Sequence, residues 1–107
     1  FAAPDYGPRD VLQIFRILQE AVTNALKHSG GDAIRVVVEP RGDGALSIAI
    51  SDNGSGGAAK GEAGRGMVNM YSRAKAAGAD LSITSDAGRG THIALHLPAR
   101  LPHLAVA

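Results

Sequence analysis

The sequence predicts an α+β domain of two layers, in which helices cover one face of a mixed, largely antiparallel sheet. Two stretches with apolar residues at three- and four-residue spacing predict helices. Each is followed by two β-branched runs joined by a glycine-containing turn, which predicts a hairpin. This order gives antiparallel strands that both helices can cover on the same side. The 107 residues, 45% of them hydrophobic, are enough for one packed core.

The first helix is expected to begin at Asp10, which forms a capping pair with Gln13. Gly30 and Gly31 are expected to end it. Residues 1–9 are predicted to be a linker, because two prolines and a glycine fall among them. The apolar residues that share one face of this helix, and that we expect to face the core, are Val11, Ile14, Phe15, Leu18, Val22, Ala25 and Leu26.

The first hairpin is expected over residues 33–39 and 45–51. Both runs are rich in β-branched residues, and the pair Asp43 and Gly44 between them favours a hairpin turn. Over residues 53–66, six of fourteen residues are glycine and almost none is apolar. We therefore predict a loop there rather than a regular element.

The second helix is expected from about residue 67 to residue 77, with Gly78 closing it. The second hairpin follows over residues 80–85 and 91–97, around a turn that contains Gly88 and Gly90. The predicted organisation of the chain is a linker at 1–9, one domain at 10–98 and a C-terminal tail at 99–107.

Composition excludes several classes of function. The absence of cysteine rules out disulfides, a cysteine-based zinc cluster and a thiol nucleophile. Eleven basic residues against ten acidic ones, with only two Phe and two Tyr, argue against a nucleic-acid-binding surface. No stretch approaches the roughly 20 apolar residues that span a bilayer. We expect a cytoplasmic domain without direct membrane contact, which is compatible with a parent protein anchored in a membrane.

Glu20, Asn24 and Lys27 form one polar face of the first helix, roughly opposite its apolar residues. A solvated helix face is the ordinary explanation for such a pattern. Carboxylate and amide oxygens one turn apart would also suit magnesium, which takes a few protein oxygens and leaves its other positions to water and phosphate. His28, one turn further, lies where a helix end tolerates positive charge, and a phosphate contact is its alternative role.

The segment 52–56 (DNGSG) follows a predicted strand and opens the glycine-rich loop. An ordinary Asp-Asn-Gly turn is one interpretation. The other is a binding site, because a fixed carboxylate can accept a hydrogen bond from an exocyclic amino group while glycines let a flat ring approach closely. The second interpretation predicts that Asp52 reads adenine.

Two further glycine pairs leave similar alternatives. Residues 64–67 (GRGM) open the second helix, where free amides can bind phosphate or simply mark a loop-to-helix junction. Residues 88–91 (GRGT) fit a tight turn. Better-known nucleotide motifs are excluded. A P-loop fails at Ala59 and Gly61, and the relaxed dinucleotide pattern fails because the following glycines would break its crossover helix.

Together and in this order, these features resemble the GHKL superfamily of ATPases and kinases. It comprises gyrase-type topoisomerases, heat-shock chaperones, mismatch-repair ATPases and histidine kinases. Residues 18–29 (LQEAVTNALKHS) look like the N box of histidine kinases, and residues 52–56 match their first glycine box, DxGxG. Residues 64–83, which begin GRGMVNMYSRA, are similar to the nitrate-sensor and desaturase-regulator type. GRGT closes the pattern, so the resemblance covers nearly all of residues 10–98.

The resemblance implies a role for each matching residue. Asn24 would bind magnesium, Glu20 would lie beside the triphosphate and its waters, and Asp52 would accept from the adenine amino group. Gly56 and Thr91 would complete the base pocket, and Glu20 with Asn24 would be the catalytic pair. The full set that the resemblance implies for ATP binding is Glu20, Asn24, Lys27, His28, Asp52, Gly54, Gly56, Gly64, Arg65, Gly66, Met67 and Thr91.

The activity that the resemblance implies is that of a histidine protein kinase. The chain would bind ATP and magnesium and supply the γ-phosphoryl group to a histidine on a separate dimerisation domain, because none of its own four histidines has an acceptor context. The implied partners are that domain of a homodimeric parent and a downstream response regulator, while the isolated domain would be monomeric. Gly57 departs from the family pattern, since an apolar residue that anchors the lid often stands there.

Two alternatives share the pattern. An anti-sigma-factor-like kinase of the same fold would phosphorylate a serine on an antagonist protein, and the NMYSRA segment argues against it. A non-catalytic module that responds to nucleotide by interacting with a partner would retain the same binding residues. Phosphotransfer to the acceptor region of the parent would distinguish that module from a kinase.

Overall fold

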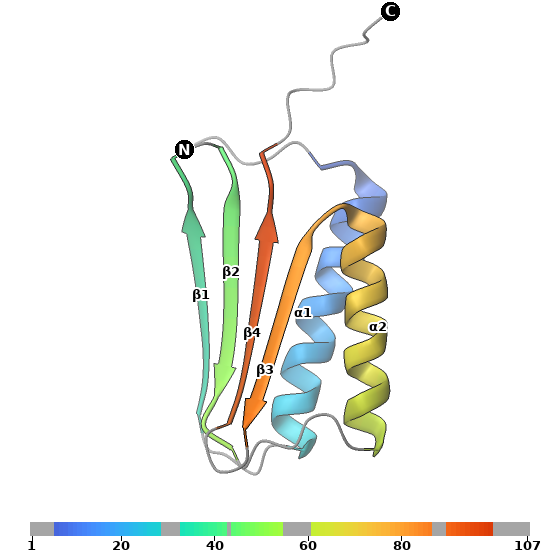
Figure 1. Ribbon diagram of the computed structural model, residues 1–107, viewed down its shortest axis with the longest axis vertical. Helices are drawn as coiled ribbons and strands as arrows, with labels where there is room; N and C mark the ends of the chain where they lie inside the picture. The colour runs from blue at the N-terminus through green and yellow to red at the C-terminus, as the bar shows by residue number, and fades with distance from the viewer. Residues whose placement is uncertain (1–5, 29–32, 43, 55–60, 87–89, 100–107) are drawn as a thin grey trace, which may run out of the picture.

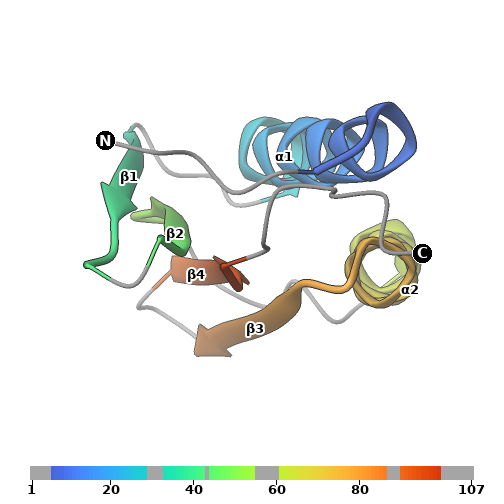
Figure 2. The same cartoon turned by 90° about the horizontal axis from the view of Figure 1, so that it is seen from above.

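The structure, a computed structural model, describes residues 6–28, 33–42, 44–54, 61–86 and 90–99. Its four strands form one sheet, and both helices pack on the same side of it (Figures 1 and 2). The elements in chain order are α1 (Pro8–His28), β1 (Ile34–Pro40), β2 (Leu46–Asp52), α2 (Gly61–Ala77), β3 (Asp80–Asp86) and β4 (Gly90–Leu97).

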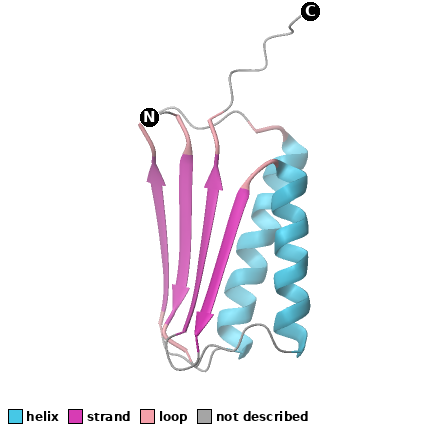
Figure 3. Cartoon of the chain, viewed as in Figure 1, coloured by secondary structure: helices cyan, strands magenta, loops and turns pink. Residues whose placement is uncertain are grey.

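The predicted two-layer α+β class is confirmed, with the helices and hairpins in the expected order (Figure 3). The strand order is β1-β2-β4-β3. All three pairings between these strands are antiparallel, so the described part of the sheet is antiparallel throughout rather than mixed. Within the described ranges, neither helix combines the length and the apolar character that crossing a membrane requires.

Helix α1 begins at Pro8, two residues before the predicted start at Asp10. Proline suits the first helical position, because its φ is already helical and its missing N–H is one that a helix leaves unpaired there. The carbonyl of Gly7 accepts a 3.0 Å hydrogen bond from the amide four residues later. Asp10 instead lies in the first turn, where a carboxylate interacts favourably with free amides. The predicted helix end at Gly30 and Gly31 lies outside the described residues.

The buried face of α1 differs from the predicted one. Val11, Phe15 and Leu26, which we expected in the core, are 52%, 60% and 73% exposed. Helix α1 packs along α2 as well as against β2, so its buried face is the one between these two neighbours. Two adjacent stripes satisfy the apolar spacing, and only these tertiary contacts choose between them. The residues of α1 that are buried are Ile14, Ile17, Ala21, Asn24 and Ala25.

Helix α2 begins at Gly61, six residues before the predicted start at Met67, so residues 61–66 are helical and not part of a loop. Residues 55–60 of the predicted loop lie outside the described part of the chain. Glu62 and Ala63 favour a helix there, although the density of glycine in this part of the chain opposes it. Gly66 lies inside the helix, and the absence of a side chain there permits a close contact with α1, which is described below. The glycine content of residues 61–66 therefore led to a wrong prediction of a loop, because Gly66 is involved in packing between the two helices.

Two predicted glycine turns are confirmed by a positive φ. Gly78 (φ 71°) ends α2: its amide donates to Lys75 O at 3.1 Å, and Ala79 N donates to Ala74 O at 2.9 Å. These paired bonds satisfy the last carbonyls of the helix. Gly44 (φ 89°) lies in the turn between β1 and β2. The predicted turn residues that lie outside the described part of the chain are Asp43 and Gly88.

The helix-facing side of the sheet consists of aligned rows of side chains. Directly opposed residues of antiparallel strands point to the same face. One such row, with one residue from each strand, is Val36, Ile50, Ile93 and Ile83, and it is wholly apolar. The core between the two layers is built from Ile14, Ile17, Ala21, Ile48, Ile50, Met70, Ala74, Ala77, Ala79, Ile93, Leu95 and Leu97.

Candidate functional site

One end of the fold collects the polar side chains that are buried. Within the described ranges, the buried polar or charged residues are Asn24, Asp52 and Thr91, each 8% exposed. They lie near the end of α1, at the end of β2 and near the start of β4, and these places share one end of the molecule with the start of α2 (Figure 1). Burial of polar groups is unfavourable without hydrogen-bond partners, and these residues are the described polar side chains that the fold buries, so this end is the candidate binding site.

On the helical side of the site, Glu20 and Asn24 both approach Gly66 of α2. A Cβ atom added to Gly66 would lie 3.1 Å from Glu20 Cδ and 3.2 Å from Asn24 Nδ2, and it would collide with Glu20 Oε1. A glycine at this position therefore leaves room for the Glu20 and Asn24 side chains to lie where they do. The prediction that Asn24 lies roughly opposite the core residues is wrong, because Asn24 shares the buried face of Ile17 and Ala21, and the alternative of a solvated face therefore does not hold for it.

On the sheet side of the site, the end of β2 holds Asp52 in a fixed orientation. Gly54 N donates to Asp52 Oδ1 at 2.8 Å. Asn53 Oδ1 accepts from Ala33 N at 3.0 Å, and Asn53 N donates to Ala33 O at 3.4 Å, which ties this strand end to the start of β1. The turn interpretation and the binding interpretation are therefore compatible. A carboxylate has more acceptor positions than one bond uses, so Asp52 can also accept from a ligand.

The start of β4 is packed tightly against the end of β2. A Cβ atom added to Gly90 would collide with the carbonyl oxygen of Asp52 and lie 3.3 Å from Asn53 Cα, and Gly90 has a φ of 81°. Next to it, Thr91 Oγ1 lies 3.0 Å from Ser85 Oγ of β3. The sequence analysis did not single out Ser85 as a partner of Thr91. The signal was available, because the two residues are equally far along the chain from the centre of the predicted turn, and such residues lie opposite each other in a hairpin.

The predicted cationic residues lie at the surface. Lys27, one turn after Asn24, is exposed, and so is Arg65 near the start of α2. Exposed cations on two elements at the same end of the fold leave their long side chains free to follow a charged ligand. Their positions are compatible with a phosphate contact, but they do not by themselves define one.

The other predicted residues are placed by their elements. Gly54 is buried, and Met67 is half-buried against the core, so this methionine contributes packing. His28 is the last residue of α1, and Gly64 lies in α2 rather than in a loop. Gly56 lies outside the described residues.

The two sides of the site offer different chemistry. Glu20 and Asn24 present a carboxylate and an amide, whose oxygens suit a hard cation that takes its other ligands from phosphate and water. No group of three or more His, Cys, Asp or Glu side chains that could hold a metal occurs in the described ranges. Asp52 and Thr91 present an acceptor and a hydroxyl, which suit the polar edge of a ring. These residues fit a nucleotide whose metal ion lies toward α1.

The contact at Gly66 gives a testable expectation. Gly66→Ala should favour the helix by up to about 1 kcal/mol. The added Cβ atom, however, forces Glu20 and Asn24 away from their places, and overpacking of this kind costs roughly 1–3 kcal/mol. We expect nucleotide affinity to fall by about tenfold in a titration, without loss of the folded state in circular dichroism.

Gly42→Ala is the matched control for this substitution. Gly42 has no atom within 4 Å of an added Cβ and no positive φ, so nucleotide affinity should stay unchanged. A Gly66→Ala variant that bound nucleotide as tightly as the unmodified chain would contradict the role assigned to this contact.

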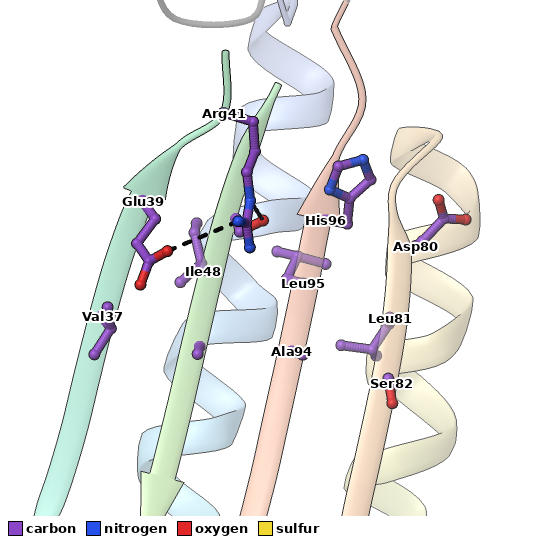
Figure 4. A pocket seen from close by; sticks show the side chains of 12 residues that line it. Val37, Glu39, Arg41, Ile48, Asp80, Leu81, Ser82, Ala94, Leu95 and His96 are labelled. Atoms are coloured by element: carbon purple, nitrogen blue, oxygen red, sulfur yellow. Dashed lines mark hydrogen bonds and ion pairs between the residues drawn. The ribbon is translucent and has the colours of Figure 1, made fainter. Parts of the chain in front are cut away.

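A hollow lies on the face of the sheet away from the helices and is separate from the candidate site (Figure 4). It measures about 290 Å³ and is lined by residues of all four strands, including His96. Arg41 Nε donates to Ser47 Oγ at 2.8 Å. Arg41 Nη1 lies 3.9 Å from Glu39 Oε2 in an exposed ion pair. Such pairs contribute little stability. None of the predicted binding residues is among those that line this hollow.

Solved structures with the same fold have low sequence identity to this chain. The histidine kinase domain of the blue-light activated histidine kinase from Erythrobacter litoralis EL346 has a TM-score of 0.69 and 22% identity, over 84% of this chain and 48% of that one. Full-length ShkA in complex with AMPPNP has a TM-score of 0.64 and 20% identity, over 80% of this chain and 21% of that one. At these identities the likeness supports the fold alone.

Curated relatives have higher identity. The chain is 35% identical over 100 residues to the signal transduction histidine-protein kinase/phosphatase DegS of Bacillus subtilis, over 89% of this chain and 26% of that protein. It is 39% identical over 87 residues to the sensor protein VraS of Staphylococcus aureus, over 79% of this chain and 25% of that protein. The chain thus spans about a quarter of the length of these relatives.

A family model covers most of the chain. The model described as histidine kinase-, DNA gyrase B-, and HSP90-like ATPase matches residues 9–101. This range contains every element of the fold except the first residue of α1, together with all the predicted site residues. The chain belongs to the family of histidine kinase-, DNA gyrase B- and HSP90-like ATPases.

Proposed function

We propose that this chain binds ATP with magnesium and supplies the γ-phosphoryl group for autophosphorylation of a histidine on a separate dimerisation domain of a two-component sensor kinase. The observation that carries the proposal is the gathering of Asn24, Asp52 and Thr91, the buried polar residues of the described ranges, at one end of the fold. Each of them stands at a position that the motif pattern assigns to ATP. The relatives DegS and VraS are named a histidine kinase and a sensor protein, which supports the same activity for the parent.

The two sides of the site would hold different parts of the ligand. Asn24 Oδ1 would bind the metal ion, and the Glu20 carboxylate would orient the water beside the triphosphate. When bound, magnesium neutralises charge on the phosphates, so catalysis is mostly positioning and electrostatic stabilisation. Asp52 would accept from the adenine amino group, and Thr91 would complete the base pocket. The exposed side chain of Lys27 would follow the ribose or the phosphates.

The phosphoacceptor histidine would belong to another domain of the parent. His92 and His96 lie on β4 and alternate with buried residues, so they point to the sheet face away from the helices. His28 ends α1 within the binding motif itself, and His103 lies outside the described residues. Since the chain spans about a quarter of its relatives, their remaining length can hold a dimerisation domain. A homodimeric parent and a downstream response regulator are part of the same proposal.

The proposed kinase subtype follows from a sequence motif, and the proposed location follows from the ligand and the partner. The NMYSRA segment supports the nitrate-sensor and desaturase-regulator type, and a cytoplasmic position is where ATP and a response regulator would meet it. The named relatives favour a sensor kinase over an anti-sigma-factor-like serine kinase. A non-catalytic nucleotide-responsive module would bind ATP in the same way, so only phosphotransfer separates it from a kinase.

Incubation with γ-labelled ATP and magnesium tests the proposal. The chain is expected to bind ATP in calorimetry but to remain unlabelled, because the acceptor lies elsewhere. Acid-labile label should develop only on an added helical acceptor region of the parent kinase. Label on one of the chain's own four histidines would contradict this assignment. Binding without transfer to that region would favour the non-catalytic module.

A further inference from the structure

We propose that Ser85 is a positioning residue for the base: it holds the hydroxyl of Thr91 so that this hydroxyl donates to the ring nitrogen beside the adenine amino group. The inference rests on the proposed function, because it assumes that ATP occupies the site of Asp52 and Thr91. Ser85 lies on β3, two strands away from Asp52, and outside the motif residues.

The pairing of the strands brings three polar residues into one row. Ser85 and Thr91 are directly opposed in the β3–β4 ladder, and their hydroxyl oxygens lie 3.0 Å apart. In the β2–β4 ladder, Ser51 opposes His92, and continuing this register by one position aligns Asp52 with Thr91. Opposed residues share a face with their Cβ atoms about 4.5–5.5 Å apart. Asp52, Thr91 and Ser85 therefore form a polar row on the helix-facing side.

The neighbouring row on the same face is apolar. It contains Ile50, Ile93 and Ile83, of which the first two are 4% and 5% exposed. Thr91 is 8% exposed and is flanked by this row on the core side. A buried hydroxyl is unfavourable without a partner, and the structure gives Thr91 the hydroxyl of Ser85. The row is therefore polar before any ligand arrives.

The numbers of donor and acceptor positions on the two hydroxyls determine which group donates to the ligand. A threonine hydroxyl has one donor and two acceptor positions. When Ser85 donates to Thr91, the Thr91 proton is left for the ligand. Adenine presents an amino donor beside a ring-nitrogen acceptor, which Asp52 and Thr91 then complement. Guanine presents a carbonyl beside an N–H, so both of its groups would face the wrong partner. Ser85 thus adds to the selection of adenine.

Titrations with ATP and 1-deaza-ATP test this role, because 1-deaza-ATP keeps the amino group and lacks the ring nitrogen. Ser85→Ala is expected to weaken ATP binding roughly three- to tenfold. Binding of 1-deaza-ATP should stay the same, since it offers no acceptor to Thr91. Ser82→Ala is the matched control: Ser82 is an exposed serine on the other face of β3, and neither affinity should change.

A second pair of variants separates the hydroxyl from the shape of the side chain. Ser85→Thr and Ser85→Val have nearly the same shape, and both suit a strand. The first should behave as the unmodified chain and the second as Ser85→Ala, so this pair decides the question if the alanine variant does not fold. Equal weakening of both ligands, or no weakening of ATP, would overturn the inference. An unmodified chain that bound no ATP would overturn the proposed function itself.

Discussion

Asp52→Ala is expected to weaken ATP binding by about 1.5–3 kcal/mol, with or without magnesium, because hydrogen bonds to a charged acceptor contribute about that much. The carboxylate is buried and its orientation is fixed by the 2.8 Å bond from Gly54 N, so it is already positioned to accept a hydrogen bond from a ligand. Calorimetry with adenosine and with ATP, each with and without magnesium, measures the effect. A guanine nucleotide should bind poorly to the unmodified chain, since its carbonyl would face the carboxylate.

Asn24→Ala is the comparison that separates base recognition from metal binding. If Asn24 acts through the cation, its loss should weaken magnesium-ATP and phosphotransfer while leaving adenosine, which has no phosphates, nearly unaffected. Asp52→Ala should weaken adenosine and ATP alike. Equal weakening of adenosine and magnesium-ATP by Asn24→Ala, in a protein that circular dichroism shows to be folded, would remove the metal-ligand assignment.

Gly90→Ala is expected to lower the free energy of unfolding by more than about 2 kcal/mol. The left-handed φ of 81° costs roughly 1–2 kcal/mol for a residue with a Cβ atom. The new atom would also collide with the carbonyl oxygen of Asp52, which is backbone and cannot rotate away, and overpacking adds roughly 1–3 kcal/mol. Urea denaturation measures the loss, and nucleotide binding should fall with it because Asp52 must move.

Gly44→Ala measures the cost of the backbone conformation without a collision, so comparison with Gly90→Ala separates the two costs. Gly44 has a similar φ of 89°, but an added Cβ atom would meet only Ala99 Cβ, at an ordinary 3.5 Å. This variant should lose only the conformational part of the free energy and should keep its affinity for nucleotide. If both variants were destabilised equally, the packing of β4 against Asp52 would not be the constraint inferred here.

The parts of the fold that the sequence predicted correctly depend on local signals. The two hairpins follow from β-branched runs on either side of a turn, and the end of α2 follows from Gly78. Asn24, Asp52 and Thr91 were predicted as site residues from the ordered motifs, and the structure places all three at one end of the fold, which is compatible with that prediction. Local signals were sufficient for the hairpins and for the end of α2.

The parts that were wrong or missed depend on neighbours distant in the sequence. The buried face of α1 was wrong because α2 lies along it, and nothing within α1 itself indicates this. The predicted start of α2 was wrong because glycines such as Gly66 are typical of loops, whereas Gly66 lies in the helix and permits the contact with Glu20. Ser85 was missed because its partner is defined by the register of two strands. In each case the environment of the residue is determined by contacts with another helix or strand.

The strand register has a consequence for how this domain can fail. The alternation that puts Ile50 and Ile93 into the core also puts Asp52 and Thr91 on the helix-facing side at the candidate site, on the same two strands. A slip by one residue would turn the isoleucines outward and bring Ser51 and His92 to the helix side in place of the site residues. A chain with this register error would therefore lose both its stability and its ability to bind ligand. Selection against misfolding and selection for ligand recognition thus act on one and the same alignment of strands.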